Sequence, residues 1–276
     1  MYIEVKMTRI TKANYYNPAR QWEYYGYSQF KDFCGGGKDT GCEARALAKL
    51  KGEWSEEPSL AMIAGGFVDA WFEGTLEQYE DRYENLIFTK PKKGQDRGAY
   101  RAEFIKAWEA IARCKRDKLF MAFMGGKKQV IMTAEMFGVQ WKIKMDSYHP
   151  DDCIVDLKYV KDLHEVIWIP DLGKVNFIEA WGYDIQGAIY QEVVRLNTGK
   201  RLPYFIAGVD KTEYPDIDII QIPNAKLSDT LSIVEYQLNR MKRVKSGEEE
   251  PLRCGRCDYC KSTKVLTSPI PLDKFR

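Results

Sequence analysis

Cys153-Ile-Val-Asp-Leu-Lys-Tyr-Val160 is the stretch that decides the fold, because an apolar strand pattern here carries two charged residues on one face. Side chains alternate between the two faces of a strand, so Asp156 and Lys158 point to the same side while their apolar neighbours point to a core. Asp146 ends the preceding apolar segment, ten residues before Asp156. If the two segments pair as a hairpin, both carboxylates lie together at one edge of a sheet.

The segments on either side of this stretch predict a sheet flanked by helices. Apolar residues recur at helical spacing in the N-terminal third, and the pattern then changes to alternation around a turn at Phe137-Gly138, which is typical of a hairpin. The predicted helices are 28–33, 42–50, 59–72, 100–116, 178–197 and 227–245, and the predicted strand segments are 130–146, 153–160, 203–209 and 217–222. This order predicts an α/β (α+β) chain with a central mixed β-sheet flanked by helices.

The length of 276 residues favours one large domain with small appendages. We expect a single domain over residues 1–276, in which 27–125 form a helical part, 126–250 form the core, and 251–276 form a cysteine-rich tail that packs back on the helical part. The formal net charge of +2 neither demands nor excludes nucleic acid as a partner. The sequence shows no apolar run long enough for a membrane helix and no signal pattern at its start, so we expect no membrane partner and a cytoplasmic location.

The acidic pair predicts a site for a divalent cation. Two carboxylates held close together repel each other, and hard oxygen ligands of this kind suit Mg²⁺ or Mn²⁺. Such a cation would lower the pKa of a bound water and stabilise charge on a phosphodiester oxygen, while Lys158 could position the attacking water or meet the developing charge. The alternative interpretation of Asp156 and Lys158 is a salt bridge on a surface strand, and the second aspartate, Asp146, argues against it.

Gln186 and Tyr190 form a polar pair on the helix predicted after the acidic strand. Residues four apart share one face of a helix. An amide and a phenol at this spacing could hold a DNA phosphate or orient a catalytic lysine. The alternative is that Gln186 is a partly buried polar residue and that Tyr190 belongs to the core.

These residues together resemble a known family. Asp146, Ile154-Val-Asp-Leu-Lys158 and Gln186-x-x-x-Tyr190, in this order, resemble the RecB-type branch of the PD-(D/E)xK nucleases. The segment Tyr27-Ser-Gln-Phe-Lys-Asp-Phe, followed by the segment that begins at Cys42, is similar to exodeoxyribonuclease VIII-like (RecE-like) phage and prophage proteins. The similarity extends from about Tyr27 to Lys264, which is nearly the whole chain.

The resemblance implies a restriction-endonuclease-like core and a Mg²⁺-dependent DNA exonuclease. It implies that linear duplex DNA is digested from its ends, in the 5′→3′ direction, in phage-type recombination. The exposed single strand would pass to an annealing recombinase, and a homo-oligomeric ring around the DNA is compatible with the family. The alternatives are a structure- or sequence-selective endonuclease and a non-catalytic DNA-binding module held by a metal cluster.

Asp69 is the third metal ligand that the resemblance implies, beside Asp146 and Asp156. Related enzymes often carry a histidine or a glutamate on an early helix, after a glycine-serine or similar pair. In this sequence Gly65-Gly66-Phe-Val-Asp69 occupies the matching place. A carboxylate can replace either residue as a ligand. The alternative is a helix residue that forms a salt bridge.

Cys254-x-x-Cys257-x-x-Cys260 indicates a metal site near the end of the sequence, because three thiolates so close together have few other uses. Zinc sites usually draw on two separated pairs. Three closely spaced cysteines with one distant partner fit a [4Fe–4S] cluster better, with zinc or a free thiol cluster as alternatives. Some RecB-type nucleases have one cysteine before the core and three after it, and this resemblance assigns Cys42 as the partner, with Cys34 as the competitor. The expected role is structural.

The basic residues that could guide DNA toward the acidic site are identified by position. Lys142 and Lys144 share one face of the strand that leads to Asp146. Together with Arg45 and Lys211 they could contact backbone phosphates. The alternative for each of these residues is an ordinary solvated surface position.

Overall fold

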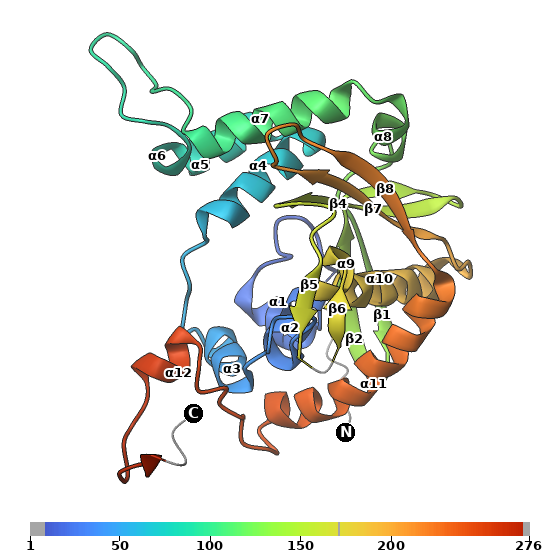
Figure 1. Cartoon of the computed structure of the whole chain (residues 1–276). Coiled ribbons are helices and arrows are strands. Elements are labelled where there is room, and N and C mark those ends of the chain that lie inside the picture. The colour runs from blue at the N-terminus through green and yellow to red at the C-terminus, as the bar shows by residue number, and fades with distance from the viewer. Residues whose placement is uncertain (1–8, 171, 273–276) are drawn as a thin grey trace.

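A four-stranded mixed sheet lies at the centre of the computed structural model, which describes residues 9–170 and 172–272. The strands, in spatial order, are β3 (Ser147–His149), β4 (Cys153–Val160), β7 (Tyr204–Asp210) and β8 (Ile217–Ile222). β4 and β7 run parallel, whereas the outer strands pair antiparallel with them. Helices pack around the sheet (Figure 1), so the predicted mixed sheet flanked by helices is confirmed.

The crossover between the parallel strands β4 and β7 is helical, as parallel pairing requires. Its helices are α9 (Phe177–Trp181) and α10 (Tyr183–Thr198). The sequence predicts one continuous helix here, but Gly182 adopts a left-handed conformation with a φ of 70° and ends α9. Glycine takes this conformation at little steric cost. The break starts a new helix, and this helix carries Gln186 and Tyr190.

The predicted hairpin around Phe137 and Gly138 forms. Its second strand does not pair with the strand of Asp156, as the sequence analysis expected. Its strands are β1 (Val130–Met136) and β2 (Val139–Met145). Both turn residues have positive φ, which suits a two-residue hairpin turn. β1 and β2 make a separate two-stranded sheet, and β3 rather than β2 pairs with β4. Asp146 therefore lies at the bend between β2 and β3, not on a strand paired with Asp156.

Two apolar cores cover the two faces of the central sheet, and strand alternation divides β4 between them. Ile154 belongs to the core built with α10, the β1–β2 hairpin, α2 (Tyr27–Cys34) and α11 (Asn224–Ser246). Val155 and Leu157 belong to the core built with α4 (Leu60–Glu73), α7 (Ala102–Lys115) and α8 (Lys118–Phe123). The same alternation places Asp156 on the α10 side of the sheet.

Several short elements were not predicted from the sequence. They are α1 (Pro18–Glu23), α6 (Glu84–Ile87), α8, α12 (Asp258–Ser262), the short strand β3 and the small hairpin of β5 (Ile167–Ile169) and β6 (Gly173–Val175). The remaining helices are α3 (Glu43–Lys51) and α5 (Leu76–Arg82). α12 contacts α3, so the cysteine-rich tail lies beside the N-terminal helices (Figure 1). None of the helices within the described ranges is both long and apolar enough to cross a membrane.

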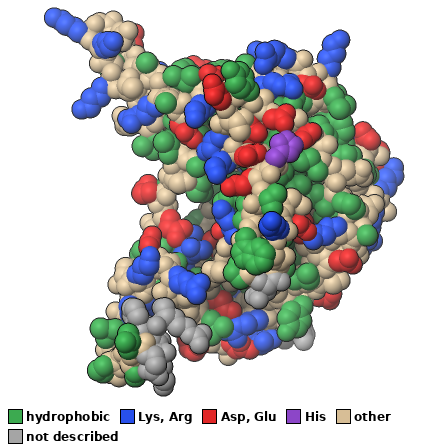
Figure 2. Space-filling view, in the orientation of Figure 1, with side chains coloured by type: hydrophobic (Ala, Val, Ile, Leu, Met, Phe, Trp, Pro, Cys, Tyr) green, Lys and Arg blue, Asp and Glu red, His purple; other side chains and the backbone are tan. Residues whose placement is uncertain are grey.

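The molecule is hollowed on one side, between the part built by α4 to α7 and the part built by α3 and α12. Figure 2 shows this hollow, with acidic and basic side chains on its borders. Residues 52–59 connect α3 to α4 along it (Figure 1). α4 therefore carries Asp69 on the part of the fold that borders an open side.

Gly187 permits α10 to pack closely on β7, which generates a prediction about stability. A Cβ atom at this position would lie 2.8 Å from a ring carbon of Tyr204 and 3.0 Å from a methyl group of Leu227. We expect Gly187→Ala to lower the free energy of unfolding by about 1–3 kcal/mol through overpacking. Urea denaturation measures this change.

Gly65 in α4 is the matched control, because a Cβ atom there would meet no heavy atom within 4 Å. Gly65→Ala should raise the free energy of unfolding by about 0.5–1 kcal/mol through helix propensity. Equal stability of both variants would contradict the close approach of α10 to β7.

Candidate active site

The open edge of β4 organises the acidic site. β3 pairs with β4 only over residues 153–155, so the next outward-facing backbone N–H, that of Leu157, lies beyond the ladder. A backbone N–H at a buried residue needs an acceptor. The carboxylate of Asp146 accepts this hydrogen bond through Oδ2 at 3.0 Å. Asp146 thus replaces the missing strand, and its side chain is fixed beside β4.

Asp156 and Lys158 point to the same side of β4, as strand alternation predicts. Asp156 is only 2% exposed and forms an ion pair with the Nζ of Lys158. The amide of Gln186 donates to Asp156 Oδ1 at 2.5 Å. Lys158 Nζ also lies 4.7 Å from the centre of the Tyr183 ring. The ammonium group is therefore held between a carboxylate and an aromatic face.

Burial and mutual repulsion set the protonation of the carboxylates. Burial raises the pKa of Asp156 to about 7, with Asp146 adding to the rise and Lys158 opposing it. Burial likewise raises the pKa of Asp69 well above its usual range, and the charge of Asp146 adds to this effect. Burial by itself would lower the pKa of Lys158, but Asp156 raises it above its ordinary value. Lys158 therefore remains charged.

The three aspartates that the sequence analysis named as metal ligands lie in one region of the fold, where the charges of Asp146 and Asp156 act on Asp69. Asp69 comes from α4, Asp146 from the bend after β2, and Asp156 from β4. Asp69 and Asp146 line one small cavity. Three carboxylates with a single lysine among them leave excess negative charge in a site of low polarity, and a divalent cation with oxygen ligands would neutralise it. The donor set therefore fits Mg²⁺ or Mn²⁺.

Gln186 and Tyr190 make hydrogen bonds to Asp156 and to the backbone near Asp146. Both side chains are buried. Gln186 fixes Asp156, and the hydroxyl of Tyr190 donates to the backbone carbonyl of Lys144 at 3.2 Å, two residues before Asp146. The sequence analysis offered a phosphate contact or the orientation of the lysine, with a buried polar residue and a core tyrosine as the alternative. In the structure Tyr190 belongs to the apolar core, and Gln186 is buried and contacts Asp156 rather than Lys158.

Two polar residues near the aspartates were missed by the sequence analysis. Glu73 lies one helical turn after Asp69 on α4 and lines the same cavity, together with Gln129. Gln129 is buried, and its Nε2 donates to Asp146 Oδ1 at 3.3 Å. The spacing of four residues from Asp69 could have identified Glu73. Nothing in the local sequence marks Gln129.

Three of the four basic residues expected to contact phosphates are buried or paired with carboxylates in the structure. Lys142 is 2% exposed, and its Nζ donates to the carbonyl of Tyr15 at 2.6 Å. Arg45 and Lys211 are held in ion pairs with neighbouring carboxylates. Lys144 lines a groove that reaches the acidic site. The other charged residues that line this groove are Asp69, Glu73 and Arg82.

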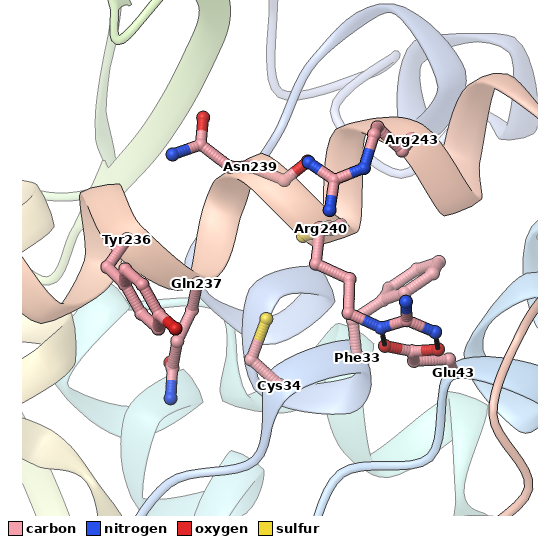
Figure 3. Close-up of a pocket in the computed structure, with 9 residues that line it drawn as sticks. Phe33, Cys34, Glu43, Tyr236, Gln237, Asn239, Arg240 and Arg243 are labelled. Atoms are coloured by element: carbon pink, nitrogen blue, oxygen red, sulfur yellow. Dashed lines mark hydrogen bonds and ion pairs between the residues drawn. The ribbon is translucent and has the colours of Figure 1, made fainter. Parts of the chain in front are cut away.

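The four cysteines Cys42, Cys254, Cys257 and Cys260 form a second candidate metal site. Their Sγ atoms all lie within 4.8 Å of one another. The Sγ atom of Cys42 lies 3.6 Å from the Sγ atom of Cys260. The choice between the two early cysteines is thereby made, because Cys34 lies elsewhere, in a groove against α11 (Figure 3).

Two backbone N–H groups contact the sulfur atom of Cys254, one member of this cluster. The N–H groups of Arg256 and Cys257 point at the Sγ of Cys254, at 3.5 and 3.4 Å. Burial raises the pKa of Cys254, but these donors outweigh burial and lower it to about 6. A thiolate is the form that binds metal. The fold therefore supplies at least one ready ligand.

Arg240 on α11 ties the cluster to the rest of the fold. Its guanidinium donates two hydrogen bonds to Glu43, at 2.7 and 2.8 Å (Figure 3). Glu43 follows Cys42 directly, and it also accepts the N–H of Leu252 at 2.7 Å. One carboxylate thus joins α3, α11 and the tail.

Binding of Mg²⁺ is expected to release more protons at about pH 6 than at about pH 8. With a pKa of about 7, Asp156 is mostly protonated at the lower pH and must lose its proton to become a ligand. Calorimetric titration in buffers of different ionisation enthalpy counts the protons. Asp156→Asn should show a smaller difference between the two conditions. Equal release by the unchanged protein at both would contradict the raised pKa.

Comparison with known proteins agrees with this geometry. Residues 26–263 match a family described as a PDDEXK-like domain of unknown function (DUF3799). The chain is 46% identical to a protein of known crystal structure from Eubacterium rectale, described as a "Putative exonuclease", with a TM-score of 0.91 and coverage of 96% of this chain and 97% of that chain. No curated protein matches significantly. The triplet Asp156-Leu157-Lys158 has the spacing of acidic residue and lysine that the family name abbreviates, and the chain belongs to this PDDEXK-like family.

Proposed function

We propose that this protein is a divalent-cation-dependent deoxyribonuclease that hydrolyses phosphodiester bonds of linear duplex DNA from its ends. The observation that carries the proposal is the placing of Asp146, Asp156 and Lys158 at the open edge of β4, with Asp69 on a cavity that Asp146 also lines. Membership of the PDDEXK-like family supports it. The similarity to a structure described as an exonuclease supports digestion from ends.

Asp69, Asp146 and Asp156 would hold the cation, Mg²⁺ or Mn²⁺. When bound, such a cation lowers the pKa of a coordinated water and stabilises negative charge on a phosphodiester oxygen. Lys158 supplies a fixed positive charge on the same side, because Asp156 keeps its pKa high. A preorganised charge of this kind stabilises the transition state more than the ground state, since negative charge grows on the phosphate oxygens.

Two buried residues of α10, Gln186 and Tyr190, and the groove beside Lys144 have supporting roles in the same proposal. Gln186 keeps Asp156 oriented, and Tyr190 fixes the end of β2, so the ligands need little rearrangement. Lys144 and Arg82 on the groove are the basic residues that would contact the DNA backbone. They replace the residues that the sequence suggested and that the fold has buried or paired.

The finer mode of action rests on resemblance to the RecE-like group. It comprises 5′→3′ polarity, a place in phage-type recombination, transfer of the exposed strand to an annealing recombinase, and a homo-oligomeric ring. The geometry of the site is compatible with either polarity. Release of nucleotides from DNA labelled at the 5′ or the 3′ end distinguishes the two.

Lys158→Ala is expected to lower the rate of digestion of linear duplex DNA in Mg²⁺ by about 10²–10³-fold, the typical loss for one electrostatic contact in a transition state. DNA binding in Ca²⁺ should be unchanged, because the groove is intact. The measurement is digestion of end-labelled linear, nicked and circular DNA, with and without Mg²⁺.

Lys161→Ala is the matched control, since Lys161 follows the same strand but is exposed and paired with Glu165. This variant should keep full activity. Full activity of Lys158→Ala would overturn the proposal. Cleavage of closed circular DNA by the unchanged protein would favour the endonuclease alternative over digestion from ends.

The four-cysteine cluster is proposed to bind a structural metal, and two observations favour different metals. The spacing of Cys254, Cys257 and Cys260 favours a [4Fe–4S] cluster. The Sγ separations of 3.6 and 3.9 Å are close to the edge of a tetrahedral zinc–thiolate site, about 3.8 Å for zinc–sulfur bonds of about 2.3 Å. Either metal would pin the tail to α3, next to Cys42.

Cys260→Ser is expected to lose the bound metal and to lower the thermal unfolding midpoint, because metal binding contributes directly to folding. Cys34→Ser is the control and should retain the metal. Elemental analysis, sulfide assay and visible absorbance of anaerobically purified protein identify the metal. Brown protein with iron and sulfide indicates the cluster, and colourless protein with one zinc indicates the tetrahedral site. Metal-free protein would contradict both.

A further inference from the structure

We propose that Gln129 is a positioning residue of the divalent-cation site, which sets the orientation of Asp146 and offers its own side-chain oxygen to the cation and its water shell. The inference rests on the proposed function, because it assumes that the three aspartates hold a cation. Gln129 belongs neither to the segment Asp156-Leu157-Lys158 of β4 nor to the pair Gln186 and Tyr190 on α10. The residue stands directly before β1, where the chain leaves α8.

The backbone of Gln129 is the first observation. Its φ is 53°, in the left-handed region that side chains with a Cβ rarely adopt. Phe137 and Asp151 are the other non-glycine residues with such a φ in the described ranges; all three lie in turns, and of the three Gln129 is the buried one. Glycine and asparagine adopt this conformation more readily than glutamine, so a glutamine here is locally unfavourable and points to a use for its side chain.

The amide of Gln129 is the second observation. The side chain is 5% exposed, and its Nε2 donates to Asp146 Oδ1 at 3.3 Å. Its Oε1 is buried and finds no hydrogen-bond partner among the described residues. A buried acceptor without a partner is unfavourable and rare in folded proteins. Orienting Asp146 would need only the donor half of this amide, and the acceptor half is left over.

The surroundings decide what the free oxygen can bind. Gln129 lines a narrow cavity. The oxygen-bearing side chains around this cavity, besides Gln129, are Asp69, Glu73 and Asp146. An ionised carboxylate only accepts hydrogen bonds and cannot satisfy an amide oxygen, and none of these side chains donates to Oε1 in the structure. A hard cation takes oxygen ligands of both kinds, amide and carboxylate. Leu157 is among the apolar side chains that also line the cavity.

The geometry therefore assigns Gln129 a double role. Nε2 holds one oxygen of Asp146, and the N–H of Leu157 holds the other. Both oxygens of Asp146 are thus restrained beside the cavity that this residue lines. Partners of this kind fix the orientation of metal ligands, and their loss typically weakens metal binding.

The test measures cation binding without DNA. Gln129→Met keeps the length of the side chain and removes both polar atoms. We expect calorimetry to show Mg²⁺ binding weakened about 10–100-fold, with an unfolding midpoint in cation-free buffer that is unchanged or higher. Gln140→Met, at the far end of the β1–β2 hairpin, is the control and should bind Mg²⁺ normally. Normal Mg²⁺ binding by Gln129→Met would overturn the inference.

Gln129→Glu provides a second readout that a purely structural role would not change. It keeps an oxygen toward the cavity but replaces the donor that faces Asp146 with another carboxylate oxygen. We expect a lower unfolding midpoint without cation and a larger rise on adding Mg²⁺ than in the unchanged protein. A midpoint lowered equally with and without Mg²⁺ would overturn the inference. If Gln129→Met does not fold, the unfolding midpoints of Gln129→Glu with and without Mg²⁺ test the inference instead.

Asp156→Asn separates this inference from the proposed function. If Asp156→Asn weakens Mg²⁺ binding and Gln129→Met does not, only the role of Gln129 is overturned. If Asp156→Asn binds Mg²⁺ as tightly as the unchanged protein, the cation site itself is overturned, and the role of Gln129 is overturned with it.

Discussion

The hydrogen bond from the Leu157 N–H to the Asp146 carboxylate is the interaction on which the rest of the site depends. β3 ends too early to pair with this part of β4, and an open strand edge must find other acceptors. A carboxylate at the bend after β2 fills that place. The same bond brings Asp146 against the strand that carries Asp156 and Lys158. The N–H of Leu157, which no strand pairs with, thus places the Asp146 carboxylate at the edge of the sheet beside Asp156.

The cost of crowding carboxylates there is met by the fold around them. Lys158 neutralises part of the charge, and Gln186 and Gln129 donate to Asp156 and Asp146. The raised pKa values of Asp156 and Asp69 show that this compensation is incomplete. Incomplete compensation is what a cation-binding site needs, because a fully paired set of aspartates would gain nothing from a metal ion.

The cysteine cluster addresses a different problem, the attachment of a short tail. α12 is a five-residue helix and buries little apolar surface by itself. Short segments of this kind are usually held by metal or disulfide links. Glu43 extends the link from Cys42 to Arg240 on α11, and so ties the tail to a helix that covers the central sheet. Through Glu43 and Arg240 the tail is therefore linked to α11, the helix that packs on the sheet.

The sequence determined the mixed sheet, the major helices, the shared face of Asp156 and Lys158, and the three close cysteines, because these follow from local periodicity and spacing. Tertiary structure decided the rest. The bend that carries Asp146, the break at Gly182, the burial of Lys142 and the place of Gln129 all depend on contacts between segments far apart in the chain. Local patterns cannot encode such contacts, since burial and charge at a residue are set by neighbours that only folding brings together.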